Sequence, residues 1–128
     1  MVKNPAADNY KLYIDGKWQD ASDGETFDTF SPANGEKLST CAEATKEDVD
    51  KAVKAANAAF EDWKAVEPIE RQEILMKIAD IIDENEEKLA MIETLDNGKP
   101  IRENNAIDMP FSSDHFRYFA GAVRAEEG

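Results

Sequence analysis

Cysteine is almost missing from this chain, because Cys41 is the only one among 128 residues. A single thiol cannot form an internal disulfide framework or a cysteine-based metal cluster. Long apolar runs are missing too, since no stretch approaches the roughly 20 residues that span a bilayer. The opening residues, MVKNPAADNYKLYIDGKW, lack the apolar segment of a signal peptide. These absences predict a cytoplasmic protein that does not enter a membrane.

Positive charge is scarce: 15 lysines and arginines face 28 aspartates and glutamates, for a net charge of −13. Such a surface repels phosphate backbones and anionic lipid headgroups, which predicts neither a nucleic acid nor a membrane as partner. The hydrophobic fraction of 41% is ordinary for a globular protein. Length and composition therefore predict one domain over residues 1–128.

Chemical motifs are also missing. The six glycines are scattered and form neither a dinucleotide-binding nor a phosphate-binding loop, and no calcium-loop or serine-nucleophile motif occurs. Cys41 lies in a predicted strand without a neighbouring cation to activate it, which favours a small buried apolar residue. His115 follows Asp114, but adjacent helical residues do not face each other, which favours a packing or surface role. The residues alone predict no catalytic group and no cofactor-binding group.

Two β-hairpins are predicted over residues 10–44. Asp15-Gly16 separates the strand-forming pieces LYI and KW, and an Asp-Gly pair in that setting is a strong hairpin signal. A second hairpin runs through TFDTF, the turn SPANG and the returning strand KLSTCA. Two-stranded pieces are marginal by themselves and need a surface to pack on. We therefore expect exposed apolar faces, and either oligomers or partial disorder, for the isolated chain.

About five helices are predicted over residues 45–128. Thr45 suits an N-cap, with Asp48 completing a capping box. One apolar stripe then contains Val49, Val53, Ala56 and Phe60, and the next contains Ile69, Leu75, Ile78 and Ile82, widened by Ile74 and Ile81.

Breaks between the later helices are marked by turn residues. Pro68 suits a first helical position, and Asn85 separates two helices. Gly98 suits the left-handed residue after a helix, and Pro100 begins a short helix. A last helix is predicted from Ser112 or Ser113 as its cap. The fold class is therefore α+β, with hairpins first and helices after.

Four collinear segments, "YIDGKW", "SPANGEKLSTCAEATKEDVDKAVKAANAAFEDW", "ERQEILMKIADIIDENEEKLAMIETLDNGKP" and "HFRYFAGAVRAEEG", resemble the N-terminal part of the NAD(P)-dependent aldehyde dehydrogenase superfamily. The last segment is most similar to bacterial acetaldehyde dehydrogenases. The resemblance covers nearly the whole chain, and it implies a part of the larger α/β fold of that family.

The resemblance implies oxidation of a small aliphatic aldehyde to a carboxylic acid with NAD or NADP, through a cysteine thiohemiacetal. The family's cysteine nucleophile, glutamate base, oxyanion asparagine and nucleotide-binding glycines lie beyond residue 128, and Cys41 does not match the nucleophile's motif. The chain is therefore expected to be an incomplete, inactive fragment of the enzyme.

Three local roles are implied by the resemblance. Backbone carbonyls of Thr29 and Phe30 and the carboxylate of Asp96 match the family's ligands for a monovalent cation, Na⁺ or K⁺; alternatively, Asp96 only caps its turn. Ile107 and Phe111 match the wall of the aldehyde tunnel; alternatively, they are ordinary core. The segment YKLYIDGKW matches a subunit contact, which implies a homo-oligomer.

Two other classes of function stay open. One is a non-catalytic oligomerisation or interaction module derived from the same fold. The other is an unrelated acidic helical adaptor, which leaves the four collinear segments unexplained.

Overall fold

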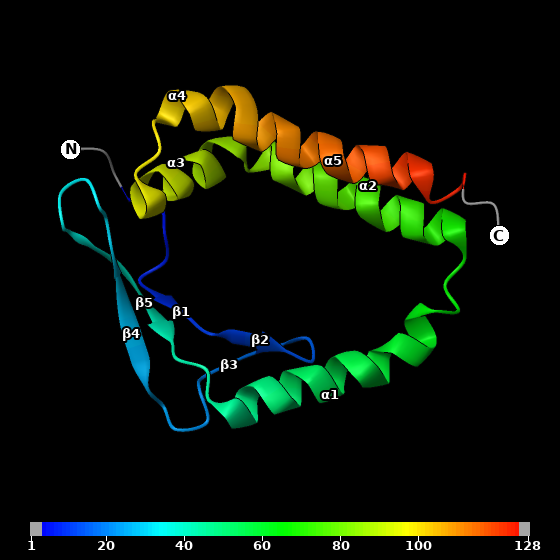
Figure 1. Ribbon diagram of the computed structural model, residues 1–128, viewed down its shortest axis with the longest axis horizontal. Coiled ribbons are helices and arrows are strands. Elements are labelled where there is room, and N and C mark those ends of the chain that lie inside the picture. Colours follow the sequence, from blue (N-terminus) through cyan, green and yellow to red (C-terminus); the bar gives the residue numbers. More distant parts are fainter. Residues whose placement is uncertain (1–3, 126–128) are drawn as a thin grey trace. The chain divides into compact units, whose positions relative to one another are not determined.

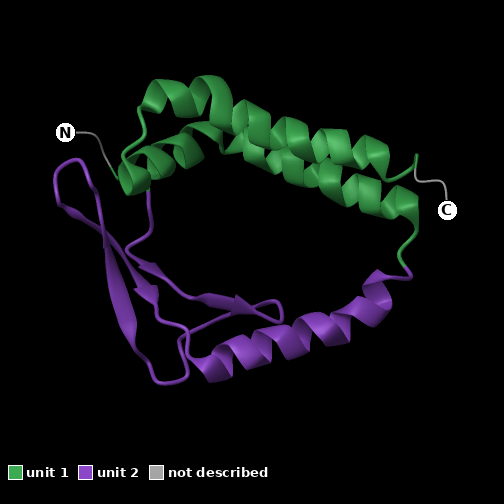
Figure 2. Ribbon diagram, in the orientation of Figure 1, with its two compact units in different colours: residues 1–5, 66–128 green, residues 6–65 purple. Residues whose placement is uncertain are grey.

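A computed structural model describes residues 4–125 and divides the chain into two compact units, which we treat separately (Figure 2). Residues 6–65 form one unit, and residues 1–5 with 66–128 form the other. The first unit contains all the strands of the described residues together with helix α1; the second contains the remaining helices (Figure 1). The predicted mixture of hairpins followed by helices is confirmed.

Both predicted hairpins are present in the first unit. Strands β2 (Leu12–Ile14) and β3 (Lys17–Gln19) pair antiparallel around Asp15 and Gly16, both at positive φ. Strands β4 (Thr26–Phe30) and β5 (Lys37–Ala42) form the second antiparallel pair, with a register shift between Thr29 and Phe30. Turn chemistry alone located both hairpins because the loop residues tolerate the backbone angles that the turns require.

A third strand completes the second sheet, which the sequence did not predict. The two-residue β1 (Asn9–Tyr10) pairs parallel with β5, giving the order β1-β5-β4. The Ser39 hydroxyl donates to the Ala7 carbonyl at 2.5 Å and holds the same edge. Such a short strand has no periodicity of its own, so only its partner 31 positions along the chain defines it.

Helix α1 (Lys46–Trp63) begins as predicted. The Thr45 side chain accepts from the Asp48 backbone, while the Asp48 carboxylate accepts from the Thr45 backbone at 3.0 Å. The same carboxylate accepts from the Ser22 backbone N–H at 3.0 Å and from the Ser22 hydroxyl at 2.5 Å, which ties the helix start to the loop before β4. The Thr45 hydroxyl also donates to this carboxylate, at 2.9 Å, and these four donors explain how a group only 3% exposed stays charged.

The apolar stripe predicted for α1 is not buried within the described residues. Alanines of α1 line a hollow together with the β2–β3 hairpin; they are Ala52, Ala55, Ala56 and Ala59. Val49, Val53 and Phe60 of the predicted stripe are instead 52%, 53% and 55% exposed. Small side chains let the hairpin lie close to the helix, whereas the larger apolar stripe is left uncovered within the described residues.

In the second unit, α2 (Pro68–Glu84) lies along α5 (Met109–Ala122), as Figure 1 shows. Ala79 and Ala120 are fully buried, while Arg117 bridges the helices by donating to Asp80 at 2.9 Å and to Asp83 at 2.7 Å. Pro68 occupies the first helical position, as predicted, because its missing N–H needs no partner there.

Asn85 separates α2 from α3 (Glu86–Asn97), and Gly98 ends α3 at φ 82°, both as predicted. The prediction of a short helix after Pro100 and a separate last helix is wrong. Instead of two separate helices, α4 (Ile101–Glu103), the π-helical turn η1 (Asn104–Asp108) and α5 form one continuous run.

Neither Ser112 nor Ser113 caps a helix in this run. The Ser112 hydroxyl donates to the Asp108 carbonyl at 2.6 Å and the Ser113 hydroxyl to the Pro110 carbonyl at 3.1 Å. Both therefore bond backward within the run, as hydroxyl side chains do in helix interiors. Among residues 4–125, no helix is long and apolar enough to cross a membrane.

Candidate functional site

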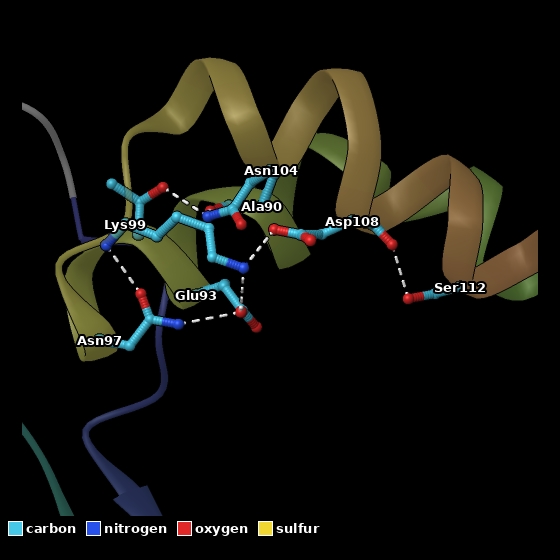
Figure 3. Close-up of polar contacts among 8 residues, drawn as sticks. Ala90, Glu93, Asn97, Lys99, Asn104, Asp108 and Ser112 are labelled. Carbon is cyan, nitrogen blue, oxygen red and sulfur yellow. Dashed lines mark hydrogen bonds and ion pairs between the residues drawn. The ribbon is translucent and has the colours of Figure 1, made fainter.

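The candidate site is the turn between α3 and α4 with the π-helical turn that follows it (Figure 3). Asp96 and Asn97 end α3, Gly98 turns the backbone, and Pro100 begins the next helical run. Asn97 Oδ1 accepts from the Lys99 backbone N–H at 2.7 Å, and Asn97 Nδ2 donates to Glu93 Oε1 at 2.9 Å. The turn is therefore held by its own side chains.

Lys99 links the turn to η1 through an ion pair with Asp108, which we call the Lys99–Asp108 brace. Its Nζ lies 2.5 Å from Asp108 Oδ2 and 3.7 Å from Glu93 Oε1 (Figure 3). The hydrogen bond to Asp108 is the main reason that the pKa of Lys99 is raised above its ordinary value. All three side chains are half-buried, so water screens this contact less than it screens a fully exposed pair.

Asn104 of η1 is hydrogen-bonded to α3 through its buried side chain. It is completely buried, and its Nδ2 donates to the Ala90 carbonyl at 3.2 Å and to Thr94 Oγ1 at 2.7 Å. Its Oδ1 has no hydrogen-bond partner among the described residues. The sequence analysis missed both Asn104 and the Lys99–Asp108 pair. The only signal for the pair is that a lysine and an aspartate lie nine residues apart across a proline-led turn.

The predicted tunnel residues lie one helical turn apart beyond this brace. Ile107 is in η1 and 53% exposed; Phe111 is in α5 and 60% exposed. Neither side chain is buried by the described residues, and both the tunnel role and the ordinary-core alternative stay predictions for the longer protein. Phe111 also packs edge-on against the His115 ring at 4.3 Å and lines a hollow of about 290 Å³, whose other lining residues are Asp114, His115, Tyr118 and Phe119.

His115 lies on this surface rather than in a catalytic arrangement. Its Nδ1 is 2.7 Å from the Phe111 carbonyl oxygen, an acceptor, so Nδ1 carries the proton. Asp114 does not share this bond. The packing role predicted for His115 is confirmed by its ring contact with Phe111.

The three predicted cation ligands are divided between the two units. Thr29 and Phe30 are adjacent at the end of β4 beside the register shift, whereas Asp96 is an exposed carboxylate at the end of α3. Because the ligands lie in different units, their convergence on one cation stays a prediction. Within residues 4–125, no group of three histidine, cysteine, aspartate or glutamate side chains is placed to hold a metal ion.

Cys41 lies in β5, as predicted, opposite Phe27 of β4 and Tyr10 of β1. It is half-buried rather than fully buried. The described residues around it include no activating cation among its strand partners, so its position is that of a packing residue.

Comparison with known proteins identifies the family. Residues 18–128 match the aldehyde dehydrogenase family. An aldehyde dehydrogenase of Vibrio cholerae is 46% identical over 121 residues, which are 94% of this chain and 24% of that protein. The chain therefore belongs to the aldehyde dehydrogenase family and spans about a quarter of the length of such relatives.

Solved structures agree with this assignment. The crystal structure of PnpE in complex with nicotinamide adenine dinucleotide matches with a TM-score of 0.90 and 44% identity, over 93% of this chain and 24% of that one. An NAD-dependent aldehyde dehydrogenase from Sinorhizobium meliloti matches with a TM-score of 0.90 and 41% identity, over 94% of this chain and 24% of that one. The fold of this chain is thus that of the N-terminal region of the family.

Proposed function

We propose that these residues serve as the N-terminal part of a longer NAD(P)-dependent aldehyde dehydrogenase that oxidises an aldehyde to a carboxylic acid. The observation that carries the proposal is the match of sequence and fold over nearly the whole chain, with a TM-score of 0.90 to a dinucleotide complex. In this reaction a thiolate adds to the aldehyde carbon, hydride leaves that carbon for the nicotinamide, and water hydrolyses the thioester, which regenerates the thiol.

The chemical groups for that reaction are supplied by other parts of the longer enzyme. Cys41 is unsuited as the nucleophile because it is half-buried among strand partners. We expect no NADH formation when the 128-residue chain alone is mixed with an aldehyde and NAD⁺ or NADP⁺. The contribution of these residues is a wall for the substrate and support for neighbouring parts of the enzyme.

Ile107 and Phe111 are the proposed wall of the aldehyde tunnel. Both are more than half exposed and lie on one side of the helical run, where they present apolar surface to a substrate. Apolar and aromatic walls favour the alkyl part of small aliphatic aldehydes. Shortening Phe111 to alanine in the longer enzyme should shift preference toward bulkier aldehydes, seen as a change in kcat/KM across a chain-length series.

A monovalent cation, Na⁺ or K⁺, is proposed to bind the carbonyls of Thr29 and Phe30 and the carboxylate of Asp96. Oxygen ligands of this kind suit a hard cation, and the Asp96 side chain is exposed among the described residues. Asp96→Asn in the longer enzyme should reduce the stabilisation by added K⁺ or Na⁺.

A second candidate function, a non-catalytic module for self-association, is favoured by the many apolar side chains that stay exposed, such as Trp18, Val53 and Phe60. The in-frame sequence after Gly128 distinguishes the two. A continuation with a cysteine nucleophile and a glycine-rich nucleotide loop, together with NADH formation by the longer product, supports the enzyme. A longer product that binds itself but gives no NADH would overturn it.

A further inference from the structure

The chain contains two Asn-Gly pairs that adopt nearly the same local structure. Asn34-Gly35 lies in the turn between β4 and β5, and Asn97-Gly98 ends α3. Both glycines have positive φ, 73° and 82°. The Gly35 N–H donates to the Ser31 carbonyl at 2.8 Å, and the Gly98 N–H donates to the Thr94 carbonyl at 3.0 Å. In both pairs the acceptor lies four residues earlier in the chain.

The side chains of Asn34 and Asn97 also make similar hydrogen bonds. Asn34 Oδ1 accepts from the backbone N–H of Glu36 at 3.0 Å, and Asn97 Oδ1 accepts from that of Lys99 at 2.7 Å. Each amide nitrogen also donates to a glutamate, Glu36 for Asn34 and Glu93 for Asn97, both at 2.9 Å. The two pairs therefore offer a matched comparison within one chain.

An Asn-Gly pair can convert its own side chain. The glycine backbone nitrogen attacks Cγ of the asparagine, a new N–C bond forms, and the Cγ–Nδ2 bond breaks as ammonia leaves with the proton of the glycine amide. Water then opens the cyclic imide to aspartate or isoaspartate. Glycine favours the attack because it has no Cβ beside the attacking nitrogen.

Neither pair can react while its turn is closed. The attacking N–H is already donated to a carbonyl, and the side-chain oxygen is held by the residue two positions on. The turn must open first, so the reaction rate follows the population of the open form.

The two turns differ in the contacts that must break when each of them opens. Within the described residues, the hydrogen bonds of the Asn34 turn join residues 31–36 to one another, and positions 32–37 are exposed to water. The Asn97 turn is joined to a 12-residue helix, and the next residue, Lys99, is paired with Asp108 of η1. Opening the second turn disturbs contacts on two elements, whereas opening the first disturbs only the turn itself.

We propose that Asn34 is a site of spontaneous deamidation, and that Asn97 is protected by the Lys99–Asp108 brace. Conversion at Asn34 adds a negative charge beside Glu36 at the hairpin tip. Conversion at Asn97 would change the side chain that holds the candidate site, so the brace preserves the geometry of the α3 turn over the lifetime of the protein.

Mass spectrometry of the purified chain tests this directly. Trypsin separates the two sites into peptides 18–37 and 89–102, because Lys99 precedes a proline and is not cleaved. The chain is aged at mildly alkaline pH, and the amide-to-acid mass gain is followed in each peptide, with a urea-denatured sample as the unprotected reference. We expect conversion in the native chain to be at least about tenfold faster at Asn34 than at Asn97, equivalent to about 1.4 kcal/mol of opening free energy.

Lys99→Gln is the decisive variant, since it removes the pair with Asp108 and keeps a long polar side chain. Conversion at Asn97 should accelerate while that at Asn34 is unchanged. Losing the positive charge of Lys99 would by itself slow conversion, because that charge favours the deprotonated Gly98 amide that attacks. Faster conversion at Asn97 would therefore show that the Lys99–Asp108 pair keeps the turn closed. Lys51→Gln, which removes the exposed pair with Glu47, is the matched control and should alter neither rate. Equal native rates at the two sites, or no acceleration in Lys99→Gln, would overturn the proposal.

Discussion

Asn104 offers a sharp test of how the α3–η1 contact is stabilised. The side chain is completely buried, with two hydrogen bonds from Nδ2 and an unpaired Oδ1. Each hydrogen bond contributes about 1 kcal/mol net, and an unpaired buried acceptor costs about 1–3 kcal/mol. The two effects nearly cancel, so the amide as a whole contributes little beyond its shape.

Three substitutions separate these effects. Asn104→Leu keeps the branched shape while removing both the hydrogen bonds and the unpaired oxygen, so the free energy of unfolding should change by no more than about 1 kcal/mol. Asn104→Ala also removes packed volume and should lose about 2–3 kcal/mol. Asn104→Asp places an acceptor against the Ala90 carbonyl and buries a charge, with a loss of at least about 3 kcal/mol at neutral pH.

The aspartate variant also has a defined pH dependence. Burial without a donor raises its pKa in the folded state above the unfolded value of about 3.9. The folded state then binds more protons than the unfolded state above that pH, so stability falls as the pH rises toward the folded pKa. The deficit should therefore be smallest in acid, where the protonated carboxyl can donate to Ala90 or Thr94.

Urea unfolding followed by circular dichroism measures these changes. Both tryptophans, Trp18 and Trp63, belong to the unit formed by residues 6–65, so their fluorescence monitors the unit that the substitutions do not touch. The order Leu, Ala, Asp from least to most destabilised is expected. A leucine variant that is as damaging as alanine would refute the cancellation, because it would show that the hydrogen bonds of Nδ2 outweigh the cost of Oδ1.

Other substitutions test the first unit. Thr45→Ala should cost about 1 kcal/mol in urea unfolding monitored by tryptophan fluorescence, because it removes the N-cap of α1; an unchanged midpoint would contradict the capping role. Donors from Ser22 and Thr45 hold the pKa of Asp48 well below its ordinary value. Its stabilising effect is therefore present above the unfolded pKa of about 3.9 and lost as the pH falls, so Asp48→Asn should flatten the acid side of the stability profile. Val53→Lys should weaken self-association in sedimentation velocity without lowering stability, since Val53 is 53% exposed; a large loss of stability would instead place Val53 in a core.

Local signals predicted the parts of the fold that depend on neighbouring residues. The Thr45 cap, Pro68, the Asn85 break and Gly98 each act within one helical turn, and each was found where the sequence places it. The Asp15-Gly16 hairpin belongs to the same class. In all these cases the residue itself has the backbone angle or hydrogen-bonding group that the structure requires.

Features that depend on distant partners were not predictable. Strand β1 exists only because β5 lies beside it. Which side of α1 faces the β2–β3 hairpin likewise depends on that hairpin, and alanines rather than Val53 line the hollow there. The π-helical turn at Asn104 is another example, since its extra residue changes which side chains point toward α3. A periodic pattern identifies an apolar face, but the partner decides which face is covered.

The π-helical turn also connects the two parts of the candidate site. One extra residue in the helical run lets Asn104 point inward to α3 while Asp108 meets Lys99, and Ile107 between them stays exposed. The same five residues thus fasten the α3 turn that contains Asp96 and present Ile107 of the proposed tunnel wall. Since π-helical turns are energetically poorer than α-helix and cluster at functional sites, this one is best explained by the side chains that it positions. The Asp-Asn-Gly turn and the apolar wall are therefore expected to move together, so that a substitution at Lys99 would affect both.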